Sequence, residues 1–197
     1  MTRTRPAEER RADLLAAGRE LFLAKGVAAT SLDDITRAAG VSKGLFYLYF
    51  RAKEDLVLAL QDQFSREFAE RVRVAAAAEP DWPDKLDAFV LAGFGYYRDL
   101  HDLHEVLFHH VHHVHHVHHE HAEQSGLSPV AQVLHDILAA GKAAGAFDVA
   151  DPELTAVLCY ASMHAFDPDF HGTTGPQSNA RLILAAQQLF RRAAGIE

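Results

Sequence analysis

The apolar residues of the chain recur at the spacing of an α-helix along nearly its whole length. Near the N-terminus, Leu14 and Phe22 lie among alanines and charged residues, which predicts an amphipathic helix from about Pro6 to Lys25. Gly26 follows at the position where helices commonly end. No stretch alternates β-branched and polar residues as a half-buried strand would. We therefore expect an all-α fold of about nine helices.

Caps and helix breakers place the remaining elements. Short helices are expected from Ser31 and from Ser42, and a long helix from about Lys53 to Ala78, before Pro80. Asp151 before Pro152 is a typical helix start, with a capping side chain and proline in the first turn. The pattern predicts further helices over residues 82–100, 101–121, 130–144, 151–167 and 179–194.

The segment around Gly40 has the pattern of two short helices joined by a tight turn. Ser31 can cap the first helix, and Asp34 can bond back to it as in a capping box. Gly40 permits the positive φ that such a turn needs, and Ser42 caps the second helix. These features predict a helix-turn-helix that binds double-stranded DNA.

The second short helix is expected to present one face to DNA. Phe46 and Phe50, with Leu45, are predicted to point inward. Gly44 would let the backbone approach the major groove, while tyrosine hydroxyls and Lys53 would bond phosphates. The residues left facing outward, wholly or in part, are Lys43, Gly44, Tyr47, Leu48 and Tyr49.

The run TSLDDITRAAGVSKGLFYLYFRAKEDL, residues 30–56, resembles the DNA-binding head of the TetR family of bacterial transcriptional repressors. The match covers about fifty residues without a gap, from the first helix to Leu56. Leu45 and Leu48 depart from the family, because small or polar residues are common at their positions. An apolar side chain there can contact a thymine methyl or simply pack, so the operator sequence stays open. The resemblance implies phosphate contacts by Ser31, Ser42, Tyr47, Tyr49 and Lys53, and base contacts by Lys43, Gly44 and Leu45.

The same resemblance implies the organisation of the whole chain. It implies a DNA-binding head at residues 1–52 and a ligand-binding and dimerisation body at residues 53–197. The homodimer would form through helices near 151–166 and 179–194 and would bind a near-palindromic operator. A small-molecule inducer bound in the body would release the DNA. Candidates for lining its cavity, each more commonly plain core, are Trp82, Phe89, Phe94, Tyr97, Phe108, Tyr160, Met163 and His164.

Charge and composition agree with DNA binding at one end of the chain. The net charge is −8, but residues 1–56 carry ten Lys and Arg against eight Asp and Glu. A mildly basic head on an acidic body suits a protein that touches DNA at one end only. With one cysteine, no secretory signal and no apolar run of about 20 residues, we expect a cytoplasmic protein without a membrane span.

Residues 109–121 form a histidine-rich segment in which nine of the thirteen residues are histidine. A valine at every third position would dock a helix, while histidines cover its open face. Histidine pairs four residues apart can bind Zn, Ni, Cu or Co. A solvated polar face, a pH response and a metal-binding role all remain open. The candidate ligands are His109, His110, His112, His113, His115, His116, His118 and His119.

Catalytic motifs find no support in the sequence. His104 and Glu105 do not continue into a zinc-binding HExxH motif, because position 108 is Phe108. We therefore expect no enzyme and no required cofactor. The favoured function is a dimeric repressor released by a small-molecule inducer. The alternative is a metal-responsive or metal-buffering protein that acts through the histidine-rich segment.

Overall fold

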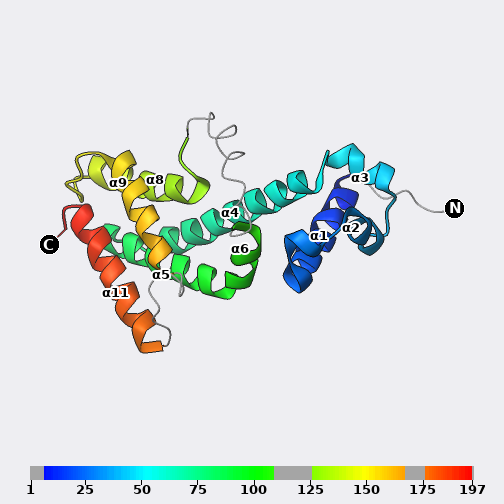
Figure 1. Ribbon diagram of the computed structural model, residues 1–197. Coiled ribbons are helices and arrows are strands. Elements are labelled where there is room, and N and C mark those ends of the chain that lie inside the picture. Colours follow the sequence, from blue (N-terminus) through cyan, green and yellow to red (C-terminus); the bar gives the residue numbers. More distant parts are fainter. Residues whose placement is uncertain (1–6, 109–125, 167–175, 197) are drawn as a thin grey trace. The chain divides into compact units, whose positions relative to one another are not determined.

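The computed structural model describes residues 7–108, 126–166 and 176–196 (Figure 1). These residues form nine α-helices and one 3-10 helix, and no strand occurs among them. In the described ranges, no helix combines the length and apolar character that crossing a membrane requires. The all-α fold predicted from the sequence is confirmed.

The chain divides into two compact units. Unit 1 takes in residues 1–64 and 100–124, and unit 2 takes in residues 65–99 and 125–197. Helix α4, Lys53–Ala78, contributes to both units. The sequence analysis placed the boundary between the DNA-binding head and the ligand-binding body at residues 52 and 53. The two units are defined by their internal contacts and not by function, so this boundary remains a prediction.

Unit 1 contains α1 (Ala7–Ala29), α2 (Leu32–Ala38), α3 (Lys43–Tyr49), the first turns of α4, and α6 (His101–Phe108). Helix α1 is interrupted at Gly26, whose φ of 79° confirms the predicted helix end. The unit is held together by fully buried side chains from four helices: Leu14, Phe22, Ile35, Phe46 and Leu56.

Close contacts tie α4 and α6 to α1 within unit 1. The Lys53 ammonium donates to the carbonyl oxygens of Val27 at 2.7 Å and Thr30 at 2.9 Å. Gly18 of α1 lies so near Leu56 that a Cβ at this glycine would be 2.5 Å from a leucine methyl. Helix α6 packs on α1, and the buried Gln61 amide donates to the Leu107 carbonyl at 2.6 Å.

Unit 2 contains the rest of α4 with α5 (Trp82–Asp99), α8 (Pro129–Ala143), α9 (Pro152–Ser162), a 3-10 turn (Met163–Phe166) and α11 (Pro176–Ala193). Helix α8 packs on α9, and α11 packs on α5. The Arg191 guanidinium of α11 donates to the Asp87 carboxylate of α5 at 2.7 Å, which joins these two helices.

Two predicted helix boundaries in unit 2 need correction. Helix α9 ends at Ser162 and tightens into the 3-10 turn, whereas a regular helix was expected to reach about residue 167. Helix α11 begins at Pro176, three residues before the predicted Asn179. Proline is well suited to the first turn of a helix, where its missing N–H has no intrahelical partner.

Five large apolar side chains stand exposed on α9 and α11, two helices that contact each other. We call this surface the α9–α11 face. The face includes three side chains within about 100° of arc on α9 and two that lie about 140° apart on α11. Its members are Leu154, Val157, Leu158, Leu184 and Leu189.

Cys159 of α9 is buried, and this burial raises the pKa of its thiol to about 11. Because only the thiolate is nucleophilic, iodoacetamide at pH 7.5 should modify the folded chain at least about a hundredfold more slowly than an ordinary exposed thiol. Mass spectrometry over time would measure this rate, with the urea-unfolded chain as the control. Modification of the folded chain as fast as the unfolded chain would contradict the prediction.

Candidate nucleic-acid interface

Helix α2 begins at the capping box predicted from the sequence. The Ser31 hydroxyl oxygen accepts from the Asp34 backbone N–H at 3.2 Å, and the Ser31 N–H donates to the Asp34 carboxylate at 3.0 Å. The Lys25 ammonium also binds this carboxylate, at 2.7 Å. These contacts satisfy backbone donors that the first turn of a helix leaves unpaired.

Lys25, followed by Ser31, holds the pKa of the Asp34 carboxyl well below its usual range. Since the folded pKa is lowered, the stabilisation is fully present above the pKa of the unfolded chain. It is lost only as the pH falls below that value toward the folded pKa. The cap is therefore ionised and intact at neutral pH.

The turn between α2 and α3 depends on Gly40, whose φ is 66°. A Cβ at this position would meet no atom within 4 Å, so the demand for glycine comes from backbone conformation and not from lack of space. The Val41 N–H closes the turn by donating to the Thr36 carbonyl at 2.9 Å. Ser42 then caps α3 by accepting from the Leu45 N–H at 3.2 Å, as predicted.

Helix α3 has one buried side and one exposed side. Phe46 is fully buried and packs against Phe50, with ring centroids 5.5 Å apart. At about 100° per residue, the exposed residues fall on the opposite side within an arc of about 140°. These exposed residues are Lys43, Gly44, Tyr47 and Leu48. Leu45 is half-buried next to one edge of this arc, and the half-buried Tyr49 lies on the opposite side of the helix.

Leu48 and Tyr47 are the most protruding large side chains of this surface. Leu48 is 77% exposed and Tyr47 is 57% exposed, and both side chains belong to the seven-residue helix α3. A Cβ at Gly44 would find open space, its nearest neighbour being the Ser42 hydroxyl at 3.9 Å. The surface is thus an exposed, capped helix with a small residue between two protruding ones, which is a shape that fits a major groove.

Two predicted DNA contacts have partners within the protein. The Lys43 ammonium lies 2.5 Å from the Asp33 carboxylate of α2. Lys53, expected at a phosphate, is half-buried and uses its ammonium on the two carbonyl oxygens at the end of α1. An ammonium has three donors, so one donor of Lys53 is left over for a phosphate. The predicted contacts remain predictions, and Lys53 also joins α4 to α1.

Sequence reasoning missed two supports of this surface. The Arg11 guanidinium lies 5.4 Å from the centre of the Phe50 ring, in a cation–π contact between α1 and the end of α3. Thr36 is buried, and its hydroxyl donates to the Leu32 carbonyl at 3.1 Å. Ala38, one turn after the buried Ile35 on α2, is nevertheless exposed. Periodicity alone does not decide the exposure of a residue at the end of a helix, such as Ala38, because this also depends on the packing of other helices.

The predicted inducer-pocket residues are spread over both units. Phe108 belongs to unit 1, where its ring stacks on His104 at 4.8 Å. The other seven lie in unit 2. Phe89, Phe94 and Met163 are buried, and Trp82, Tyr97 and Tyr160 are half-buried, whereas His164 is exposed.

One hollow of about 300 Å³ in unit 2 includes Trp82. It lies among α4, α5 and α8, with Arg73, Lys85 and Asp136 as its charged residues. The Trp82 ring is held edge-on against Phe147, with centroids 5.9 Å apart. Such a volume is at the small end of the range for organic ligands.

The histidines predicted as metal ligands, residues 109–119, lie outside the described residues. Among the residues that are described, no group of three or more His, Cys, Asp or Glu side chains is arranged to hold a metal ion. The metal-binding role of the histidine-rich segment therefore stays a prediction.

Comparison with known proteins agrees with the geometry of unit 1. Residues 14–60 match a family model described as "Bacterial regulatory proteins, tetR family". Two curated relatives are transcription regulators. The activator FasR of Mycolicibacterium smegmatis is 36% identical over 91 residues, 46% of this chain and 42% of FasR. The regulator TtgR of Pseudomonas putida is 45% identical over 56 residues, 28% of this chain and 27% of TtgR. The chain thus spans less than half the length of these curated relatives.

Solved structures extend the likeness over the whole fold. A tetR-family transcriptional regulator from Pectobacterium atrosepticum aligns over 98% of each chain, with a TM-score of 0.69 and 27% sequence identity. A protein of the same description from Mesorhizobium loti aligns over 98% of each chain, with a TM-score of 0.76 and 15% identity. The second likeness is one of fold alone.

Proposed function

We propose that this chain is a ligand-responsive repressor of the tetR family, and that it binds a near-palindromic operator as a homodimer. Its residues 14–60 match the family model described above. The observation that carries the proposal is the exposed side of α3. It is capped by Ser42, backed by the buried Phe46, and leaves Tyr47 and Leu48 protruding. A helix presented in this way can enter a major groove.

The α9–α11 face supports the homodimer. It lies on the two helices predicted to form the dimer, and its five large apolar side chains have no cover within the described residues. A second copy of the chain would bury them through a two-fold axis, which is the commonest arrangement of soluble oligomers. Dimerisation would then place two α3 helices to contact two half-sites.

Two features support regulation by a small molecule. Helix α4 runs without a break from residues that anchor it to α1 into unit 2, so a change in unit 2 can be passed to the head. The hollow beside Trp82 offers apolar walls and charged groups to a ligand. An inducer needs only a higher affinity for the form that binds DNA poorly.

The test begins with selection of bound fragments from the genome of the source organism by the full chain. In fluorescence anisotropy, Tyr47→Phe should weaken binding to every selected fragment by about tenfold, because it removes a hydroxyl that would bond a charged phosphate. Tyr96→Phe, a change of the same kind in unit 2, where the ring stacks on Phe68, should bind like the parent. Parental affinity in Tyr47→Phe would contradict the contact assignment, and failure to select any fragment would contradict DNA binding.

The same assay separates the remaining alternatives. A promoter fusion gives the direction of regulation, and reduced expression in the presence of the chain supports repression. Addition of Zn or Ni tests the metal-responsive alternative through the affinity for the selected fragment. Release of DNA by metal alone would favour that alternative over an organic inducer.

A further inference from the structure

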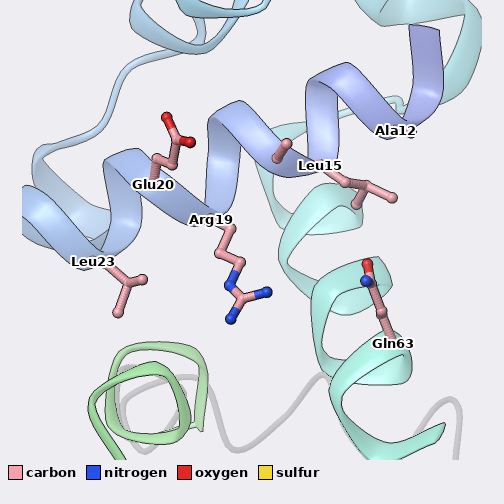
Figure 2. Close-up of a pocket in the computed structure, with 7 residues that line it drawn as sticks. Ala12, Leu15, Arg19, Glu20, Leu23 and Gln63 are labelled. Atoms are coloured by element: carbon pink, nitrogen blue, oxygen red, sulfur yellow. The ribbon is translucent and has the colours of Figure 1, made fainter. Parts of the chain in front are cut away.

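A second hollow, of about 370 Å³, lies in unit 1 between α1 and α4 (Figure 2). Six residues of successive turns of α1 line one side, and Gln63 lines the other from α4. We call it the Arg19 hollow, after the cation among its lining residues. It is separate from the hollow beside Trp82, which lies wholly in unit 2.

Arg19 extends from α1 into this space. Figure 2 shows its side chain extending from α1 on the side where Leu23 and Gln63 lie, and the Glu20 side chain, which also lines the hollow, points upward from α1 in this view. Arg19 is half-buried, and within the described part of the chain no ion pair or hydrogen bond engages its guanidinium. A guanidinium binds a carboxylate through two parallel hydrogen bonds, and withdrawal from water strengthens such a pair.

Four of the other six lining residues are apolar, and the remaining two are Glu20 and Gln63. Leu15 and Leu23 stand on either side of Arg19 along α1. Ala12 and Ala16 also line the hollow. A ligand with one negative charge and a hydrocarbon tail matches one cation beside this apolar strip. A dianion such as a phosphate ester would need a second cation, and Arg19 is the one cation among the described residues that line the hollow.

We propose that the Arg19 hollow binds a medium-chain carboxylic acid, with its carboxylate on Arg19 and its tail along Leu15 and Leu23. The site also has the position of an effector site, because it lies between α1 and α4, two helices that also meet at the Gly18–Leu56 contact. Helix α1 supplies Leu14 and Phe22 to the core that supports α2 and α3. A ligand bound between α1 and α4 therefore changes the affinity of the chain for DNA. This effect rests on the proposed function, whereas binding of the carboxylic acid to the hollow does not.

The experiment uses the full chain and octanoate as the probe. Isothermal titration and ligand-observed NMR should show saturable binding of octanoate, and much weaker binding of octanol, which lacks the charge. Arg19→Gln should weaken octanoate binding at least tenfold. Ala16→Phe should block the hollow while keeping the charge. The matched control is Arg73→Gln, the same change at the hollow beside Trp82, and circular dichroism checks that each variant folds.

Loss of octanoate binding in Arg19→Gln and Ala16→Phe, with parental binding in Arg73→Gln, supports the site. No binding to the parent, or loss only in Arg73→Gln, overturns it. A second experiment compares the affinity of the chain for a selected DNA fragment with and without octanoate. An unchanged affinity while octanoate is bound overturns the effector role, and failure to bind any DNA contradicts the proposed function without touching the binding result.

Discussion

Replacing Phe46 with alanine should abolish DNA binding, although Phe46 is on the side of α3 turned away from DNA. The side chain is fully buried and contacts the rings of Tyr47 and Phe50. Truncating a buried phenylalanine typically costs about 3–5 kcal/mol of the free energy of unfolding, through lost burial and the cavity left behind. Loss on this scale is comparable to the whole stability of a small unit, so α3 would no longer be held in place.

Leu48→Ala, two residues away on the same helix, is the matched control. Because Leu48 is 77% exposed, its loss should change the free energy of unfolding by no more than about 0.5 kcal/mol. It should instead alter the preference among selected fragments, if its side chain meets a thymine methyl. Urea unfolding followed by circular dichroism, together with anisotropy, measures both effects. Parental DNA affinity in Phe46→Ala would contradict the role of this core.

Replacing Leu158 with glutamate should convert the proposed homodimer to monomers and lower its affinity for a selected DNA fragment at least about a hundredfold. Leu158 is 63% exposed on the α9–α11 face, one turn beyond Leu154. In a two-fold dimer each substitution occurs twice, so two unpaired carboxylates would be buried. A monomer would also lose the second half-site, and with it the contacts of one α3 helix.

Val74→Glu provides the control for this second prediction. Val74 is 60% exposed on α4, outside the α9–α11 face, and should remain dimeric with parental DNA affinity. Analytical ultracentrifugation at micromolar concentration gives the oligomeric state. A Leu158→Glu variant that stays dimeric would place the dimer interface elsewhere, and dissociation in Val74→Glu would show that any added charge has the same effect.

The local features of the DNA-binding surface could be predicted from sequence because each depends on residues close together in the chain. The Ser31–Asp34 capping box spans three residues, and the positive φ of Gly40 is a property of one residue. The Asp151 cap of α9 likewise accepts from the N–H of Leu154, three residues later. Such features follow from backbone geometry alone, whatever packs around them.

The roles of long side chains depended on partners that are distant in sequence. Lys53 is of a residue type that commonly binds phosphates, yet its ammonium donates to the carbonyl oxygens of Val27 and Thr30, more than twenty residues earlier. Lys43 lies against Asp33, ten residues earlier on a different helix. Nothing in the spacing of the motif reveals these pairs, since they form only when α1, α2 and α4 pack together.

The sequence by itself determined the helices, their caps, the turn at Gly40 and the side of α3 that faces outward, because these are set by periodicity and by contacts within one or two turns. Only the tertiary structure decided that Phe108 lies in a different unit from Trp82, that five apolar residues stand uncovered on α9 and α11, and that Arg19 extends into a hollow. The physical reason is that burial and cavities belong to surfaces brought together from distant segments. A helical pattern shows which side of a helix is apolar, but not what covers that side.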